Sequence, residues 1–450
     1  MPSTFKTIEC KFRQGPVVLV SREIAFTFPL SYGYLAGYLR EMGQDVRILF
    51  RNTDRKTLVK QIMDLNPVLV GFGSLYPELK EIGSIISSLD KAGRKFPVVI
   101  GGQMVTPTPE FAVSVTGADF GIIGEGELTL HRLVCALRDG KDASDVKGLA
   151  IRSGDATTTT GPGEIIRDLS KLPAIPYDLF PEEQWLPIGR WYAAKCPQPH
   201  WRFEDRVVNV HGGRGCPFVC NFCYHHSKPR YRPISLMLAE GSEALDRFKA
   251  NMLYFSDDLV LFNRKRAKEL ATEIRTLKRP IQYSVSARFD LLDKMDDDLL
   301  LEMKETGCRI MGLGIESGSD RVLKVVGKKF SSETILNGLE RLKNVGILPT
   351  VSIMVGQDTE TVEDAEASIE LMRKSVRYNP HIQYAFTLTT PFPGSQLYDH
   401  IFREGLLKDH QEFYDKYFST DGEWAQVVNL SNMTENECLR MYKKIQDAYQ

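Results

Sequence analysis

The sequence predicts an α/β protein built from two successive runs of alternating strands and helices. Short, β-branched apolar segments alternate with segments of helical spacing, first over residues 1–140 and again over residues 206–400. This alternation is typical of parallel sheets covered by helices. A length of 450 residues also exceeds that of one ordinary domain. We expect a domain with a five-stranded sheet over 1–140, a connector over 141–205, a partial (β/α)6 barrel over 206–400 and a short helical C-terminal cap over 401–450.

The first run predicts a Rossmann-like domain. Its candidate strands are Val17–Ser21, Val46–Phe50, Val68–Phe72, Val98–Gly101 and Phe120–Ile123, and its candidate helices are Tyr32–Met42, Lys56–Leu65, Glu78–Lys91 and Glu127–Leu137. Ligands of such sheets bind beyond the carboxyl ends of the strands. The candidate binding residues there are Gly73, Ser74, Gly101, Gly102, Gln103 and Glu125. Neither glycine-rich turn is a full dinucleotide fingerprint, and a tight turn is an equally good interpretation of each.

The second run predicts the barrel. Its candidate strands are Val207–His211, Met252–Phe255, Ile281–Ser286, Arg309–Gly314, Pro349–Val355 and Ile382–Leu388, and its candidate helices are Leu236–Lys249, Arg264–Leu277, Asp297–Thr306, Ser332–Val345 and Val362–Val376. Function in such barrels collects where the strands end. The polar residues there are Ser256, Asp257, Asp258, Ser286, Arg288, Glu316, Ser317, Gln357, Asp358, Thr389 and Thr390. Helix capping is an alternative for Asp257 and Asp258, and for Ser317 with Asp320, and a surface ion pair is an alternative for Arg288. The coincidence of these residues on one rim favours chemistry.

Three cysteines follow the first barrel strand in a CxxxCxxC pattern. They are Cys216, Cys220 and Cys223, in the stretch GCPFVCNFC that begins at Gly215. Cysteine thiolates are the usual ligands of iron–sulfur clusters, and three of them on a four-iron cube leave one iron open. The alternatives are a zinc site completed by one of three histidines, His211, His225 or His226, and three unrelated buried thiols. Because zinc ligands usually come in separated pairs, the single tight loop favours a [4Fe–4S] cluster.

Composition excludes several classes of function. The formal net charge is −1, which gives no bulk attraction to nucleic acid or to an anionic membrane. No apolar stretch has the form of a signal peptide or the length of a membrane span. The remaining five cysteines are scattered and do not form a disulfide framework. We expect a cytoplasmic protein with neither a nucleic acid nor a membrane as its partner.

With Tyr224 directly after the third cysteine, the loop resembles the signature of the radical S-adenosylmethionine (SAM) enzymes. Phe255–Asp258 resembles the FxDD stretch of that family, Gly314–Gly318 its GxESG stretch, and Pro391–Ser395 the segment that closes its barrel. The resemblance implies a [4Fe–4S] cluster that chelates SAM and cleaves it reductively. The resulting 5'-deoxyadenosyl radical takes a hydrogen atom from a small-molecule substrate. An external electron donor of flavodoxin or ferredoxin type is also implied.

The same resemblance assigns roles to the rim residues. Asp257 and Asp258 would meet the SAM amino group as part of the catalytic machinery, and Arg288 would meet its carboxylate. Glu316 and Ser317 would meet its ribose and methionine parts. Phe222, Ser256 and Ser286 complete the cofactor site. Tyr224 is a candidate to return a hydrogen atom or relay a proton, and packing beneath the cluster is its alternative role.

The first domain resembles the cobalamin-binding domain that precedes the barrel in B12-dependent radical SAM enzymes. The segments that carry the likeness are Pro29–Ala36, Val70–Ser74, Val99–Gly102 and Gly124–Glu127. It implies a corrin at the sheet edge. The chain departs from the family pattern in three places: it has no Asp-x-His-x-x-Gly stretch, it has Gln103 where histidine is common, and it has Phe50 where an acid is common. A domain that no longer binds corrin is therefore the alternative.

Three hypotheses of function stay open, of which the resemblance implies the first two. The first is cobalamin-dependent C-methylation, or rearrangement, of a natural product. The second is corrin-independent dehydration or deoxygenation of a sugar diol, of the kind found in aminoglycoside pathways, with Tyr224 near the radical and a partner reductase as a further candidate partner. The third is a non-catalytic corrinoid or zinc protein. Only the first two require SAM cleavage.

Overall fold

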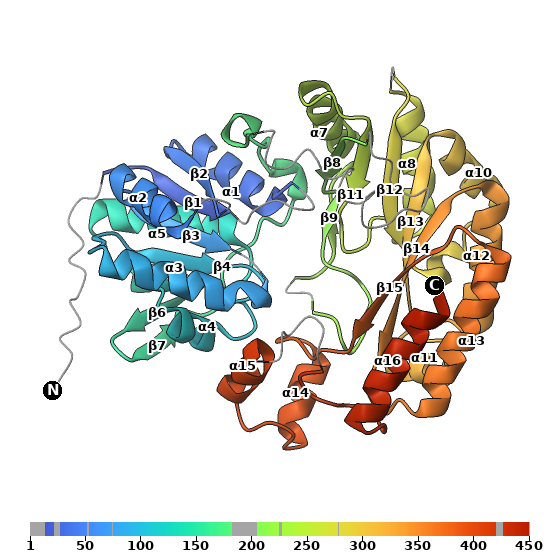
Figure 1. Cartoon of the computed structure of the whole chain (residues 1–450). Helices are drawn as coiled ribbons and strands as arrows, with labels where there is room; N and C mark the ends of the chain where they lie inside the picture. The colour runs from blue at the N-terminus through green and yellow to red at the C-terminus, as the bar shows by residue number, and fades with distance from the viewer. Residues whose placement is uncertain are drawn as a thin grey trace. The chain divides into compact units, whose positions relative to one another are not determined.

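The computed structural model describes residues 14–21, 28–51, 54–73, 75–181, 205–224, 227–277, 279–419 and 426–449. Ser74, His225, His226 and residues 182–204 of the predicted connector lie outside these ranges. The chain forms two compact units (Figure 1). One contains residues 14–21 and 29–181, and the other contains Phe28 and residues 205–449.

A seven-stranded sheet forms the centre of the first unit, in the order β2-β1-β3-β4-β5-β6-β7. The first five strands are parallel: β1 (Val17–Ser21), β2 (Val46–Phe50), β3 (Leu69–Gly73), β4 (Val98–Gly101) and β5 (Phe120–Ile122). They confirm the five predicted strands. The hairpin of β6 (Leu149–Ser153) and β7 (Ala156–Thr159) pairs antiparallel with β5. Residues assigned to the connector therefore extend this sheet beyond the predicted five strands.

Helices of the first unit pack in two groups. Helix α1 (Leu30–Glu41) lies beside α5 (Gly126–Asp139), and α3 (Leu79–Lys91) lies between α2 (Arg55–Leu65) and α4 (Pro109–Thr116). The sequence predicted four of them and missed α4. That short helix begins with Pro109 and ends at Gly117, which has a positive φ of 73°. Proline at the start and glycine after the end are ordinary helix boundaries.

The second unit is built on a six-stranded parallel sheet whose spatial order, β15-β14-β13-β12-β11-β8, follows the chain. The strands are β8 (Val207–Val210), β11 (Met252–Phe255), β12 (Gln282–Ala287), β13 (Cys308–Glu316), β14 (Leu348–Val355) and β15 (Gln383–Leu388). The helices are α7 (Ile234–Arg247), α8 (Arg264–Arg275), α9 (Phe289–Leu292), α10 (Asp297–Glu305), α11 (Asp320–Val325), α12 (Ser332–Val345) and α13 (Val362–Tyr378). Most of these helices line the outer side of the sheet (Figure 1). The predicted partial barrel is confirmed.

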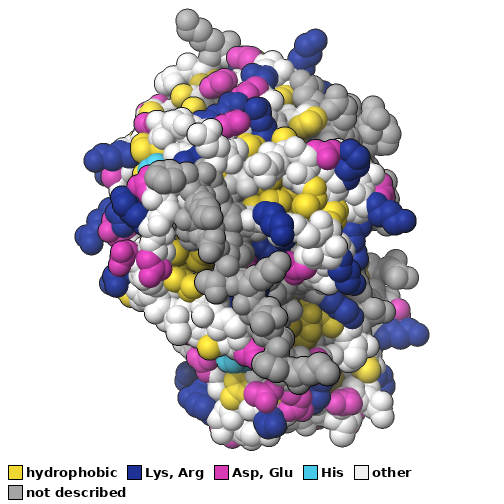
Figure 2. Space-filling view, turned by 90° about the vertical axis from the view of Figure 1, so that its left-hand side faces the viewer, with side chains coloured by type: hydrophobic (Ala, Val, Ile, Leu, Met, Phe, Trp, Pro, Cys, Tyr) yellow, Lys and Arg dark blue, Asp and Glu magenta, His cyan; other side chains and the backbone are white. Residues whose placement is uncertain are grey.

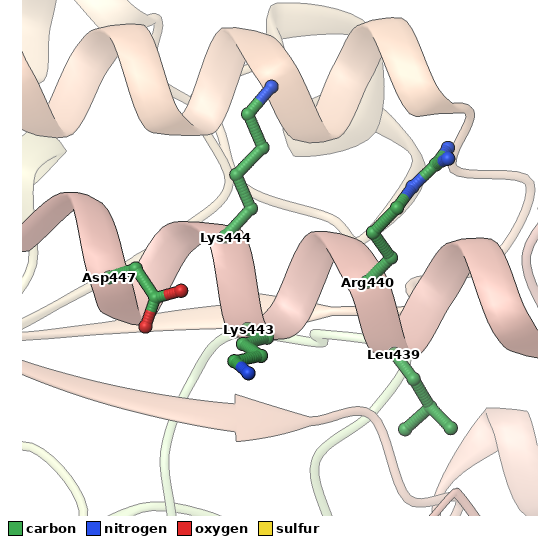
Figure 3. Close-up of a pocket in the computed structure, with 5 residues that line it drawn as sticks. All are labelled: Leu439, Arg440, Lys443, Lys444 and Asp447. Atoms are coloured by element: carbon green, nitrogen blue, oxygen red, sulfur yellow. The ribbon is translucent and has the colours of Figure 1, made fainter.

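The C-terminal region is helical, as predicted, and comprises α14 (Gln396–Arg403), α15 (His410–Ser419) and α16 (Glu435–Tyr449). Helix α16 packs against α13 and the last two strands. Its surface carries a shallow groove of about 540 Å³ lined by Leu439, Arg440, Lys443, Lys444 and Asp447 (Figure 3). Lys444 is ion-paired with Glu366 of α13. The groove thus belongs to the helix layer and not to the carboxyl edge of the sheet.

Charged side chains of both signs are interspersed on the face drawn in Figure 2. This distribution agrees with the near-balance of 57 basic and 58 acidic residues in the sequence. Among the described residues, no helix combines the length and the apolar character needed to cross a membrane.

Candidate functional site

The three cysteines lie on the loop Gly215–Cys223, called the cluster loop below, which leaves the carboxyl end of β8. Two short antiparallel strands, β9 (Gly213–Arg214) and β10 (Arg230–Tyr231), close its base. Gly215 has a φ of 78°, and a Cβ there would lie 2.5 Å from the carbonyl oxygen of Ser227. Only glycine allows the two arms of the loop to approach so closely.

Backbone hydrogen bonds hold the cluster loop from two sides. The Asn221 N–H donates to the Val326 carbonyl at 3.3 Å, and the Leu397 N–H, at the start of α14, donates to the Asn221 carbonyl at 3.0 Å. Cys216 and Cys220 are half-buried, whereas Cys223 is exposed. Among the described residues, no three His, Cys, Asp or Glu side chains gather as ligands of a single metal ion would. Three free thiols on one loop are a donor set that fits a [4Fe–4S] cluster, in which each thiolate binds a separate iron.

Asp257 and Asp258, which follow β11, anchor the base of the cluster loop. Asp257 is buried and accepts the Gly212 N–H at 2.9 Å. Asp258 accepts the Gly215 N–H at 3.0 Å. Burial raises the pKa of Asp257 to about 7, although the Gly212 hydrogen bond and the charge of Arg266 oppose the shift. Neither acid caps α8, because Asn263 does so; the helix-cap alternative for these acids is wrong.

Two serines link neighbouring strand ends. The Ser256 hydroxyl donates to the Val210 carbonyl, and the Ser286 hydroxyl donates to the Asp257 carbonyl, each at 3.3 Å. These bonds join the carboxyl ends of β8, β11 and β12. The structure therefore brings both predicted serines to the rim from which the cluster loop departs.

Arg288 is buried against the cluster loop, so the surface ion pair weighed for it is wrong. Its Nε and Nη2 donate to the two carboxylate oxygens of Asp290 at 2.9 and 3.3 Å. Its Nη1 lies 3.6 Å from Cys220 Sγ, and its guanidinium carbon lies 3.7 Å from the centroid of the Phe218 ring. Arg288 thus bridges strand β12 and the second cysteine.

Lys328 is a site residue that sequence reasoning missed. Its Nζ lies 3.0 Å from Glu316 Oε1 and 5.8 Å from the centroid of the Phe222 ring on the cluster loop. Burial raises the pKa of the Cys220 thiol, and the charges of Lys328 and Arg288 oppose that rise. Lys328 lies in the turn after α11, where no motif marks it. Only the fold brings it to the rim.

Glu316 adopts a left-handed backbone conformation, with a φ of 66°. Its carboxylate accepts from Lys328 and, at 2.9 Å, from the Ser352 hydroxyl. A left-handed conformation costs a non-glycine residue about 1–2 kcal/mol, and such strain often accompanies a functional site. The neighbouring Ser317 is fully buried, and its hydroxyl lies 3.3 Å from that of Ser368 on α13. Ser317 does not cap α11; Ser319 does.

Tyr224 is half-buried and its ring packs on the backbone of Gly394. A Cβ at Gly394 would lie 2.5 Å from Tyr224 Cδ2. Gly394 belongs to the segment that the sequence predicted to close the barrel. Burial raises the pKa of Tyr224, which keeps the phenol neutral.

In the first unit, the predicted binding residues lie at the carboxyl ends of β3 and β4. Gly102 and Gln103 are exposed there, and Glu125 is buried at the start of α5. The Tyr32 hydroxyl accepts the Gly73 N–H at 2.7 Å and lies 2.8 Å from the Val20 carbonyl oxygen, which ties the ends of β3 and β1 together. Glycines leave the backbone of this edge accessible, so the edge fits a flat ligand such as a corrin.

Two protein-family models match the chain, one in each of the two units. Residues 210–372 match the radical SAM superfamily model, and residues 18–134 match the B12 binding domain model. The chain therefore contains a radical SAM domain and, before it, a B12-binding domain. It is 27% identical over 425 residues to an uncharacterized methyltransferase of Pyrococcus horikoshii, and the alignment covers 92% of this chain and 86% of that protein.

Two solved structures share the fold. The radical SAM methyltransferase TsrM of Kitasatospora setae matches with a TM-score of 0.70 and 18% identity, over 86% of this chain and 76% of that one. The cobalamin-dependent SAM radical enzyme OxsB matches with a TM-score of 0.72 and 15% identity, over 96% of this chain and 66% of that one. One TsrM structure holds cobalamin and a [4Fe–4S] cluster, and one OxsB structure holds aqua-cobalamin and SAM.

Proposed function

We propose that this protein is a cobalamin-dependent radical SAM methyltransferase that methylates a carbon atom of a small natural-product molecule. The observation that carries the proposal is the cluster loop, which is anchored at the carboxyl edge of a six-stranded parallel sheet in a chain that also has a B12-binding domain. The methyltransferases among its relatives support methyl transfer.

The residues of the site would have different roles. Cys216, Cys220 and Cys223 would hold a [4Fe–4S] cluster, and Asp257 and Asp258 would keep the loop in place through its backbone N–H groups. A bound, reduced cluster would supply the electron that cleaves one SAM to methionine and a 5'-deoxyadenosyl radical, and bound methylcobalamin would supply the methyl group, which a second SAM would restore with release of S-adenosylhomocysteine.

Other rim residues would bind SAM and shield the radical. The Glu316 carboxylate would accept hydrogen bonds from the SAM ribose. Tyr224, half-buried and neutral, would exclude water beside the third cysteine. In the first unit, the exposed backbone at Gly102 and Gln103 would receive the corrin. An external flavodoxin- or ferredoxin-type protein would supply the electrons.

The test is anaerobic reconstitution of the full chain with iron, sulfide and hydroxocobalamin, followed by desalting and quantification of each. We expect a four-iron cluster and retained corrin. Addition of SAM and a reductant should then give 5'-deoxyadenosine and S-adenosylhomocysteine. The variant with Cys216→Ala, Cys220→Ala and Cys223→Ala should give no 5'-deoxyadenosine.

Each contrary result has a distinct meaning. A four-iron cluster without corrin would contradict cobalamin-dependent methylation and leave corrin-independent radical chemistry. Zinc in place of iron, or 5'-deoxyadenosine from the triple variant, would overturn the radical assignment altogether.

A further inference from the structure

One cysteine of the cluster loop has a distinctive environment. Cys220 Sγ lies 3.6 Å from Arg288 Nη1, which is within hydrogen-bonding distance for a sulfur acceptor. The Arg288 side chain is only 7% exposed. A buried cation therefore faces one specific ligand of the expected cluster.

Arg288 is fixed by contacts on two sides of its guanidinium. Asp290 takes one edge in a two-pronged ion pair, and Phe218, from the cluster loop itself, stacks on the flat face. Such a planar, doubly held group loses little further freedom when it donates to a third partner. The direction of its Nη1 toward Cys220 is thus built into the fold.

We propose that Arg288 is a positioning residue that hydrogen-bonds the Cys220 thiolate and raises the reduction potential of the cluster. This inference deepens the proposed function and rests on it, since it requires the cluster. It differs from the role that the sequence suggested, in which Arg288 pairs with the SAM carboxylate.

The physical reason is electrostatic. One electron from an external donor adds one negative charge to the cluster. A hydrogen bond to a ligand sulfur and a nearby cation both favour that added charge, most strongly where water is excluded. Asp290 partly cancels the cation, so the two side chains should shift the potential in opposite directions.

The experiment is an anaerobic redox titration of the cluster in the full chain, followed by electron paramagnetic resonance without SAM or substrate. In Arg288→Lys and Arg288→Gln we expect reduction to become at least tenfold less favourable, which is about 59 mV more negative for a one-electron couple. In Asp290→Asn we expect a shift to more positive potential. If Arg288 and Asp290 only supported the structure, their substitutions would not shift the reduction potential in opposite directions.

Arg266→Lys is the matched control. Arg266 is also buried, but its guanidinium donates to the backbone carbonyls of Gly212 at 3.2 Å and Arg232 at 3.1 Å and not to a cysteine. Its loaded cluster should keep the wild-type potential. An unchanged potential in both loaded Arg288 variants, or shifts of the same sign in Arg288→Lys and Asp290→Asn, would overturn the inference. A wild-type chain that assembles no cluster would instead defeat the proposed function.

Discussion

The buried carboxylate of Asp257 accepts the backbone N–H of Gly212 at 2.9 Å, at the point where the chain leaves the first barrel strand for the cluster loop. Asp257→Ala would leave that N–H without its partner and would remove one of the two acids whose charges act on Arg266. We expect a loss of about 2 kcal/mol in the free energy of unfolding and a lower iron and sulfide content after reconstitution. Asp257→Asn keeps an oxygen acceptor and should load a nearly complete cluster.

Asp298→Ala, at an exposed position in the first turn of α10, is the control for this prediction. It should leave both the unfolding midpoint and the iron content unchanged. If Asp257→Ala behaved like Asp298→Ala, the anchoring role of Asp257 would be wrong.

Packing of Tyr224 on Gly394 gives a second prediction. Gly394→Ala introduces a methyl group 2.5 Å from the ring at a φ of 90°. Gly405→Ala introduces one at a φ of 66° with no atom within 4 Å, so it measures backbone strain alone. We expect about 1 kcal/mol of destabilisation at Gly405 and roughly 3 kcal/mol at Gly394, where steric overlap is added.

Denaturant unfolding of the two alanine variants checks this difference. Adding Tyr224→Ala to Gly394→Ala should recover part of the loss, because it removes the ring that the new methyl group meets. Equal destabilisation at the two glycines would contradict the packing of Tyr224 on Gly394.

Much of this architecture could be predicted because local patterns determine it. Buried parallel strands such as β1 are continuous apolar runs, and the spacing of three cysteines within one loop is visible without any tertiary information. Because the strands were expected to be parallel, the residues after their carboxyl ends were expected to meet at one rim. The sequence pattern did not show that β6 and β7 join the first sheet. Their pairing with β5 depends on the path that the chain takes after α5.

The hydrogen-bond and ion-pair partners of the side chains were harder to predict than the places of these residues in the fold. Asp257 and Asp258 were expected near SAM, which stays a prediction; that their carboxylates also accept the N–H groups of Gly212 and Gly215 was not foreseen. Lys328 was missed because helix α11 separates it from Glu316 in the sequence, so no local pattern joins the two residues. Contacts of this kind arise from tertiary packing, which the sequence pattern does not encode locally.

Glu360 gives a prediction about pH. Glu360 follows β14, and its side chain is fully buried. Burial raises its pKa from 4.5 to about 7, although hydrogen bonds from the N–H groups of Gln357 and Gly356 oppose the shift. A pKa raised on folding contributes stability that is complete below pH 4.5 and is lost as the pH rises through about 7. At about 1.4 kcal/mol per pKa unit, the loss is roughly 3 kcal/mol.

Glu360→Gln removes this titration and keeps an acceptor for the two N–H groups. Urea unfolding at several pH values from about 5 to 8 should show wild-type stability falling relative to the variant. Parallel pH profiles for the two proteins would show that Glu360 does not titrate in this window.

Glu316 gives the last prediction, which separates SAM binding from cluster assembly. If its carboxylate binds the SAM ribose, Glu316→Gln should load a full cluster but weaken SAM binding about tenfold, since hydrogen bonds to a charged group are worth about 1.5–3 kcal/mol. Equilibrium dialysis of labelled SAM against the anaerobically loaded chain measures the effect. Glu333→Gln, at an exposed position in the first turn of α12, is the matched control and should bind SAM as the wild type does. Equal affinity in the two variants would remove Glu316 from the SAM site and leave its ion pair with Lys328 as its main role.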